Sequence, residues 1–371
     1  MVVRVYLKQA WNLMKQNPLF STLYIVGTGI SIVMTMVIAI VYYVRLAPVY
    51  PETNRMRTLV VKSAKMTNDE STHSSNISYA MLKDWFYSLE SAEVSTGVSG
   101  TSYARVTNDK EEIPTYARYT DENFFRVFPL VFLEGKPFTE ADRRSGIHNV
   151  VLTDSYAQQL FGTTKGVVGK NFLMDYTNVK VVGVVKSGRF LTPDSYAQVY
   201  LPYSCRDGYD DEGSHWALGG YRVYILMKES KSVTDVQDEV LELVRKFNVS
   251  DMGDGWKLDL VGQPELYWHS TFRLWSNVAV DWGRVIWMFV GIFMVLLFVP
   301  AFNLSGMISA RMERQLPDLG IRKAFGASRR RLLVQIIWEN LLLTGLGTLL
   351  GLVIAWIVLA LSGYEIFSLF E

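Results

Sequence analysis

The chain has 371 residues, a formal net charge of +1 and a hydrophobic fraction of 49%. That apolar content is high for a soluble protein, and it is concentrated in three uncharged runs at residues 19–44, 285–310 and 341–364. Each run exceeds the roughly 20 residues that a membrane-spanning helix needs, so the composition excludes an ordinary soluble protein and predicts three spans.

The first 18 residues predict a cytoplasmic amphipathic helix that lies on the membrane and leads into the first span, residues 19–45. This stretch carries Arg4, Lys8 and Lys15 and no acidic residue. A signal peptide is the other interpretation of such a start. The run is too long for one and lacks a small-residue cleavage site, so a retained anchor is favoured.

Residues 46–283 have a mixed α/β pattern, which predicts a large domain of two α/β or α+β lobes. Strand patterns lie at 57–62, 150–152 and 221–227, and a hairpin at 172–185 is expected to turn at Thr177 and Asn178. Helices are predicted at 78–89 after the cap Ser78, at Asp154–Phe161 with Gly162 as its stop, and at 234–247.

Nothing in the sequence predicts catalysis, and no cofactor or metal site is expected on this chain. The four histidines are scattered without metal-ligand spacing, and no Gly-x-Ser-x-Gly motif is present. Residues 164–171 approach a Walker A motif, but Thr164 replaces its first glycine and Asn171 its magnesium-binding Ser or Thr. No part of the large domain combines basic clusters with aromatic residues, so nucleic-acid binding is not expected.

The second predicted span, residues 284–309, is followed by a basic loop at 310–331, a third span at 332–362 and a short external tail at 363–371. The loop has seven basic and two acidic residues. Because basic short loops stay in the cytoplasm, the N-terminus and this loop are expected inside and residues 46–283 outside. Glycines in the first and third spans permit close helix packing: Gly27, Gly29, Gly345, Gly347 and Gly351.

Within the loop, the sequence predicts a separate two-turn helix at 317–325. Pro317 suits a first helical turn, and Gly326 supplies a left-handed stop. Ser328 is expected to cap the next helix, which runs into the third span. A nine-residue helix is unstable alone, so its apolar patch of Leu319, Ile321 and Phe325 needs the membrane or another protein to pack on. Arg329, Arg330 and Arg331 are interpreted as topology signals that contact lipid headgroups.

The run DLGIRKAFGA, residues 318–327, resembles the loop-to-helix segment of the MacB/FtsX-like ABC transporter permeases. Residues 122–142, 150–162 and 181–186 resemble the extracytoplasmic core domain of that family. The resemblance implies a fold in which a MacB-like α/β domain is inserted between the first and second transmembrane helices. Members of the family have four spans, whereas this sequence has three predicted ones. The expectation is therefore that the last transmembrane helix of the family is missing here, either because the sequence is part of a longer chain or because the protein is an atypical member.

The resemblance further implies that the chain is a permease subunit without enzymatic activity of its own. It would transmit ATP-driven movement from a separate ABC ATPase subunit, which binds the ATP, for export, extrusion or mechanotransmission. The ATPase-coupling helix would comprise Asp318, Leu319, Gly320, Ile321, Arg322, Lys323, Ala324, Phe325 and Gly326.

The other implied partners are a second permease subunit, in a homo- or heterodimer, the membrane and in some systems a periplasmic adaptor. The implied location is the bacterial inner membrane, with several passes. The alternative function is a membrane-anchored extracytoplasmic sensor or adhesion protein that has no ATPase partner; a membrane enzyme is a third, supported by no motif.

Overall fold

The computed structural model describes residues 11, 15, 18–100, 102–107, 112–188, 192–210, 216–250, 255–326 and 328–361. The chain divides into two compact units: an α/β domain, Val44–Asp281, and a helical unit made of Met1–Tyr43 and Trp282–Glu371. The predicted N-terminal helix at 1–18, apart from two of its residues, and the predicted tail at 363–371 lie outside the described residues.

The first sheet of the α/β domain has eight strands, in the order β14-β2-β3-β13-β1-β15, with β12 also pairing with β3 and β4 with β13. The β1–β13 and β13–β4 pairs are antiparallel. The strands are β1 (Thr58–Val61), β2 (Ala64–Thr67), β3 (Thr72–Ile77), β4 (Ala92–Ser99), β12 (Leu218–Gly219), β13 (Tyr221–Met227), β14 (Lys257–Asp259) and β15 (Glu265–Leu266). Three helical segments belong to this part of the chain: α3 (Tyr79–Asp84), η1 (Phe86–Ser88) and α7 (Val233–Val249).

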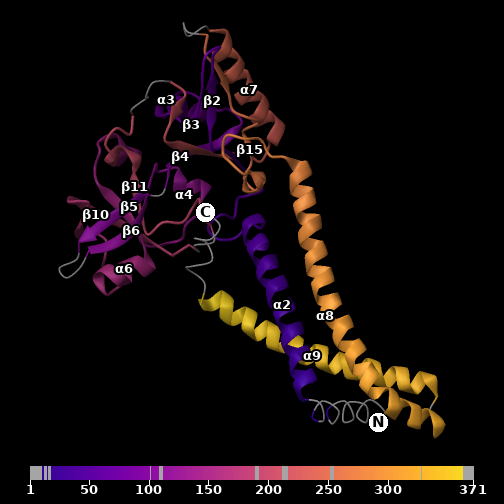
Figure 1. The fold of residues 1–371 in the computed structure, drawn as a ribbon. Helices are drawn as coiled ribbons and strands as arrows, with labels where there is room; N and C mark the ends of the chain where they lie inside the picture. The colour runs from indigo at the N-terminus through magenta and orange to yellow at the C-terminus, as the bar shows by residue number, and fades with distance from the viewer. Residues whose placement is uncertain are drawn as a thin grey trace. The chain divides into compact units, whose positions relative to one another are not determined.

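The second sheet has seven strands in the order β7-β10-β8-β11-β6-β5-β9, and β9 also pairs with β10. Its strands are β5 (Ser102–Thr107), β6 (Glu112–Thr120), β7 (Phe132–Gly135), β8 (Asn149–Thr153), β9 (Asn171–Met174), β10 (Thr177–Val185) and β11 (Val199–Pro202). β8 and β10 are parallel, and α6 (Asp154–Phe161) lies in the connection between them. The remaining short helices are α4 (Phe124–Val127), α5 (Glu140–Arg144), η2 (Tyr203–Cys205) and η3 (His269–Phe272). Two sheets confirm the prediction of two lobes (Figure 1).

Helix α4 fills the space between the two sheets. Phe124 and Phe128 are almost fully buried in one apolar cluster that holds residues of both sheets. The Phe124 ring lies 5.4 Å from Tyr200 of β11, and the Phe128 ring lies 5.2 Å from Tyr224 of β13. Aromatic pairs at such separations stabilise beyond the area they bury. The two lobes therefore share a core, and α4 is the element on which both sheets pack.

Several local predictions are confirmed, and one turn is misplaced. Helix α6 has the predicted bounds and ends at Gly162 with φ +70°. Ser78 caps α3, but the helix ends at Asp84 and gives way to η1, so the predicted helix at 78–89 is too long. The hairpin turns at Asp175 and Tyr176, not at Thr177 and Asn178, because Asp175 and Tyr176 both take the positive φ of a two-residue hairpin loop.

Three long helices make up most of the described helical unit: α2 (Pro18–Leu46), α8 (Trp282–Ala324) and α9 (Arg329–Leu361). Among the described residues, Ser21–Ile40 and Ile336–Val358 have the length and hydropathy of a membrane span, while the apolar part of α8 at Trp282–Phe298 is shorter. These helices fit a membrane protein. The count of three spans remains a prediction.

Helices α2 and α9 cross at glycines (Figure 1). A Cβ atom on Gly351 of α9 would lie 2.7 Å from the carbonyl oxygen of Gly29 in α2, and one on Gly347 would lie 2.8 Å from the Cβ of Thr28. The hydroxyls of Tyr24 and Thr344 are 3.0 Å apart across the same contact. Small residues thus let the two backbones touch, as predicted for Gly29, Gly347 and Gly351. The same prediction is wrong for Gly345, because no described atom lies within 4 Å of a Cβ atom built there.

We expect Gly351→Ala to destabilise the contact between α2 and α9 by about 1–3 kcal/mol, because the obstacle is a backbone oxygen that cannot rotate away. Gly345→Ala is the matched control on the same helix, since nothing lies within 4 Å of a Cβ there. The control should keep or slightly raise stability, because alanine favours helix over glycine. Thermal unfolding of the full chain in detergent measures both, and equal midpoints would contradict the prediction.

Candidate functional site

The prediction of a separate helix at 317–325 is wrong. Helix α8 runs without interruption through Pro317 to Ala324 and is drawn as one helix in Figure 1. A proline inside a helix removes one backbone hydrogen bond, whereas a break would leave up to four N–H and four C=O groups unpaired at the new ends. The preceding residues 312–316, Met-Glu-Arg-Gln-Leu, also favour helix. The predicted coupling segment is therefore the end of α8 itself.

The stop of this helix is where the sequence predicts it. The Phe325 N–H donates to the Ile321 carbonyl at 3.0 Å, and the Gly326 N–H donates to the Lys323 carbonyl at 3.0 Å. Gly326 then takes φ +89°, a conformation that glycine adopts without steric cost. Helix α9 begins at Arg329, directly after Ser328, as predicted. Only residues 325–328 separate the end of α8 from the start of α9.

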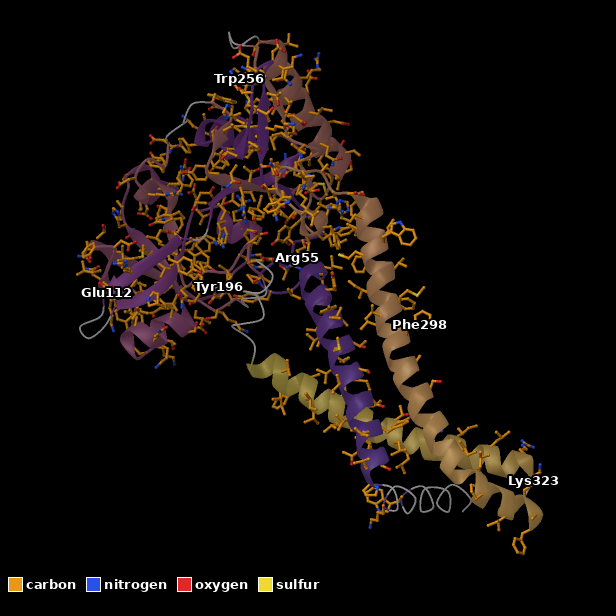
Figure 2. The ribbon with its side chains drawn as sticks, in the orientation of Figure 1. Arg55, Glu112, Tyr196, Trp256, Phe298 and Lys323 are labelled. Atoms are coloured by element: carbon orange, nitrogen blue, oxygen red, sulfur yellow. The ribbon has the colours of Figure 1, made fainter. Side chains whose placement is uncertain are left out.

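The end of α8 exposes large apolar side chains. Phe325 is 88% exposed and Ile321 is 57% exposed, and Leu316, five residues before Ile321, is also exposed. Ile321 and Phe325 are four residues apart and therefore lie on one face of the helix. Of the other predicted site residues, Gly320, Lys323, Ala324, Gly326 and Arg330 are exposed, and Lys323 is labelled at this end in Figure 2. The structure thus brings an uncovered apolar face together with basic charge.

Five of the predicted site residues are described by their backbone alone. The side chains of Asp318, Leu319, Arg322, Arg329 and Arg331 lie outside the described set, although their backbone is helical. The apolar patch is therefore described for two of its three predicted members, Ile321 and Phe325. The assignment of the arginines at 329–331 to topology and lipid contact stays a prediction.

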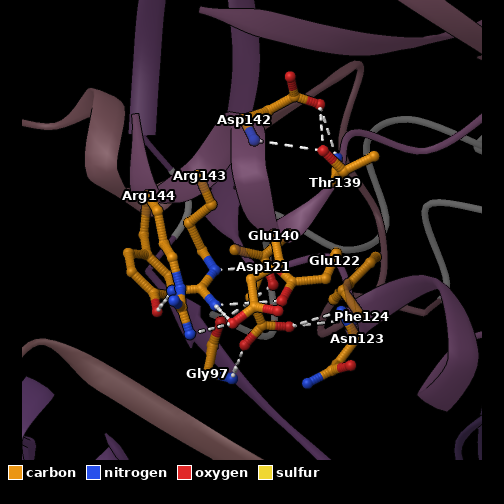
Figure 3. A network of polar contacts seen from close by, with 12 residues as sticks. Gly97, Asp121, Glu122, Asn123, Phe124, Thr139, Glu140, Asp142, Arg143 and Arg144 are labelled. Carbon is orange, nitrogen blue, oxygen red and sulfur yellow. Dashed lines mark hydrogen bonds and ion pairs between the residues drawn. The ribbon is translucent and has the colours of Figure 1, made fainter. Parts of the chain in front are cut away.

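A second candidate site, a buried polar network, lies between the two sheets of the α/β domain (Figure 3). The sequence did not predict it. The fully buried carboxylate of Asp121 accepts hydrogen bonds from the Thr96 hydroxyl at 2.6 Å, the Gly97 N–H at 2.9 Å and the Tyr87 hydroxyl at 2.6 Å. Its Oδ1 also accepts from the N–H groups of Asn123 and Phe124. Asp121 thereby ties β4 of one sheet to the start of α4.

Burial raises the pKa of Asp121 to about 6, and the hydrogen bonds from Thr96, Tyr87 and Gly97 limit that rise. Burial also raises the pKa values of Tyr87 and Tyr203, so both hydroxyls keep their protons and act as donors. The aspartate is therefore the group of this trio whose charge changes in the physiological range.

The network continues from Asp121 to the surface helix α5. The Tyr87 hydroxyl lies 3.4 Å from the Tyr203 hydroxyl, which accepts from Arg143 Nη1 at 2.8 Å. Because Tyr87 uses its proton on Asp121, Tyr203 must donate to Tyr87. Arg143 in turn donates to both carboxylate oxygens of Glu122, at 2.8 and 3.1 Å. A closed polar ring thus starts and ends at the neighbouring residues Asp121 and Glu122.

A local signal for this ring exists in the sequence. An aspartate shortly before a hydrophobic helix commonly accepts from the N–H groups that follow it, as Asp121 does. Thr139 and Asp142 form a capping box at the start of α5, which positions Arg143. Neither pattern, however, indicates that Tyr87 and Tyr203 close the ring.

Comparison with known proteins identifies both parts of the chain. Residues 20–243 match the model of the MacB-like periplasmic core domain, and residues 277–370 match that of the FtsX-like permease C-terminal domain. The macrolide export ATP-binding/permease proteins MacB of Escherichia coli O157:H7 and of E. coli K12 are each 22% identical over 268 residues. The match covers 71% of this chain and 39% of the length of those relatives.

Two extracytoplasmic domains are among the solved structures that are similar to this chain. The periplasmic region of MacB from Actinobacillus actinomycetemcomitans matches at a TM-score of 0.38 and 16% identity, over 53% of this chain and 88% of that one. The extracellular domain of the noncanonic ABC-type transporter YknZ from Gram-positive bacteria matches at 0.37 and 16%, over 53% and 99%.

Apolar helices long enough for a membrane, joined to a large α/β domain that matches a periplasmic one, define a membrane-embedded permease. The chain belongs to the family of MacB/FtsX-like permeases, the membrane subunits of ABC transporters. Membership places it in the inner membrane, with the α/β domain in the periplasm. The names of the relatives include ATP binding, which is a property of those proteins.

Proposed function

We propose that this chain is a permease subunit that transmits ATP-driven movement from a separate ATPase subunit to its transmembrane helices and its periplasmic domain. The observation that carries the proposal is the exposed apolar end of α8 around Ile321 and Phe325. Exposed apolar side chains grouped on one helix face, with basic residues beside them, are typical of a protein docking site. ATP would bind to the partner, and this chain would hold no cofactor.

The length of α8 supports direct mechanical transmission. Its 43 residues extend about 65 Å at 1.5 Å per residue. The hydrocarbon core of a bilayer is about 30 Å thick, so a span within α8 leaves a projecting helical segment. Because the end of α8 is continuous with the rest of the helix, a push on Ile321 and Phe325 would move the whole helix. A separate coupling helix would need a hinge that this arrangement lacks.

The proposal includes a second permease subunit, in a homo- or heterodimer, and several passes through the membrane. Movement of the periplasmic domains would then serve export, extrusion or mechanotransmission, with a periplasmic adaptor where the system has one. The small-residue contact of α2 with α9 supports a compact bundle in each copy.

We expect Phe325→Asp to weaken binding of the ATPase subunit by about 2 kcal/mol, roughly thirtyfold in Kd, because a buried phenylalanine would be lost and a carboxylate buried. The affinity of the full chain in lipid nanodiscs is measured for an ABC ATPase subunit from the same organism, and the rate of ATP hydrolysis is measured in the same samples. Stimulation of hydrolysis should fall in parallel.

Tyr176→Asp is the matched control, since Tyr176 is an aromatic residue of the periplasmic domain that is 87% exposed, against 88% for Phe325. It should bind the ATPase like the unmodified chain. Equal affinity of the Phe325→Asp variant and the unmodified chain would contradict the docking site. Absence of any ATPase binding by the unmodified chain would favour the sensor or adhesion protein instead.

A further inference from the structure

We infer that two buried arginines, Arg55 and Arg273, are positioning residues that clamp the chain where it enters and leaves the α/β domain. They would pass movement of α2 and α8 to that domain without slack. The role of the clamps in transmitting movement rests on the proposed function. The contacts that form them are observed within the α/β domain alone. Both clamps lie within that domain.

The first clamp holds the segment that follows α2. Arg55 is 3% exposed, and its Nη1 donates to the carbonyl of Ala47 at 3.0 Å. Ala47 comes directly after Leu46, the last residue of α2. The Nε of Arg55 donates to Glu52 at 2.8 Å, and Glu52 also accepts from the Ser195 hydroxyl at 2.7 Å. The point where α2 ends is therefore bonded to a buried, internally paired charge; Arg55 is labelled in Figure 2.

The second clamp holds the segment that precedes α8. The side chain of Arg273 is 3% exposed and is paired with the buried Glu265. Its Nη1 donates to the carbonyl of Val278 at 2.6 Å, and its Nη2 donates to that of Val261 at 2.9 Å. The Ser63 hydroxyl donates to the carbonyl of Ser276 at 2.7 Å. The backbone is thus fixed to within four residues of Trp282, where α8 begins.

The two clamps meet on one pair of strands. Glu265 lies on β15 and pairs with Val60 of β1. Tyr267, two residues after Glu265, donates its N–H to the Thr58 carbonyl at 2.9 Å, and its ring lies 5.3 Å from the guanidinium of Arg55. β1 is itself paired along its length with β13. Force on either connecting segment therefore enters the same part of the eight-stranded sheet.

The choice of arginine points to position more than to stability. A buried ion pair is often no more stabilising than apolar side chains of the same volume. A guanidinium, however, offers five hydrogen-bond donors in a rigid plane. Here both arginines donate hydrogen bonds to backbone carbonyls of the connecting segments. An arginine needed only for the interior of the domain would have no reason to reach Ala47, which directly follows α2, and Val278, which lies four residues before α8.

The test measures how tightly α8 is coupled to the α/β domain in the full chain. Spin labels are placed on cysteines at the exposed positions Leu241 of α7 and Phe293 of α8, in a Cys205→Ser background and in lipid nanodiscs. Pulsed electron resonance gives the distribution of distances between them. We expect a narrow distribution for the chain without further changes.

Four glycines inserted between Val278 and Trp282 leave both clamps intact and add slack beyond them, so the distribution should broaden. The same insertion between the exposed residues Lys165 and Gly166 is the control and should leave it narrow. Arg273→Lys keeps the positive charge opposite Glu265 but loses the planar guanidinium that bonds both carbonyls. This variant should also broaden the distribution of distances. A distribution that stays narrow after the insertion beside α8 would overturn the inference, whatever the folding of the arginine variant.

Binding of the ATPase subunit is measured on the same variants and should be unchanged, because the end of α8 is not altered. This separates the two proposals. If the unmodified chain fails to bind the ATPase but shows the narrow distribution and its loss on insertion, the proposed function fails and the clamp stands. If the ATPase binds and the insertion has no effect on the distribution, the clamp fails and the proposed function stands.

Discussion

Arg55→Ala is expected to lower the free energy of unfolding of the α/β domain by about 3–5 kcal/mol, because it leaves a buried carboxylate without its partner. The side chains of Arg55 and Glu52 are 3% and 0% exposed, so water cannot replace the lost cation. Burial raises the pKa of Glu52, while Arg55 acts against that rise. The midpoint of thermal unfolding of the full chain should fall by roughly 10 °C.

Two comparison variants make this prediction specific. Arg245 forms an exposed pair with Glu242 on α7 at 2.8 Å, and Arg245→Ala should cost less than about 1 kcal/mol. The double change Glu52→Gln with Arg55→Met removes both buried charges, so it should recover most of the loss seen for Arg55→Ala. Equal losses for Arg55→Ala and Arg245→Ala would show that the buried pair has no special weight.

Asp121→Asn is expected to change how the stability of the α/β domain depends on pH. In the folded domain the pKa of Asp121 is about 6, against an ordinary value of 3.8. The folded state therefore binds this proton more tightly than the unfolded state, so the stability it contributes is present at low pH and is lost as the pH rises from about 4 to about 6. The full loss is about 3 kcal/mol, from 1.36 kcal/mol per pKa unit.

The measurement is the free energy of unfolding of both proteins at several pH values between 4 and 7. Asparagine does not titrate, and other buried groups such as Glu52 and Asp194 are common to both chains, so their effects cancel in the difference. The stability of the unmodified chain relative to the Asp121→Asn variant should fall as the pH rises. A difference that is constant across this range, or that rises with pH, would refute the raised pKa.

The sequence predicted best where the physical cause is local. The bounds of α6 and the stops at Gly162 and Gly326 follow from helical periodicity and from glycine at a positive φ, and the structure has all three. The sequence went wrong at Pro317, where a proline that fits a first turn lies inside α8. Whether a helix ends at a proline depends on the balance between one lost hydrogen bond and the ends that a break creates, which the local pattern does not show.

The hairpin and the end of α8 show the same limit. Asp175 and Tyr176 form the turn because the register of β9 with β10 pairs Met174 with Thr177. This register is set by contacts between the two strands, and from the sequence alone the turn was placed two residues too late. The predicted patch at Ile321 and Phe325 needed only helical spacing, and both residues are exposed, Ile321 in the last turn of α8 and Phe325 directly after it. The affinity measurement with the Phe325→Asp variant tests whether the ATPase subunit binds this patch.

The sequence by itself determined the class of this protein. Long uncharged runs, a basic loop and a left-handed helix stop are local or compositional features, so they can be identified in the sequence without knowledge of the tertiary structure. Only the tertiary structure decided which charges matter inside the α/β domain. Asp121, Arg55 and Arg273 are ordinary charged residues in the sequence, and their partners Tyr87, Ala47 and Val278 are set by the fold. A charge acquires its role from burial, and burial depends on contacts between residues far apart in the chain.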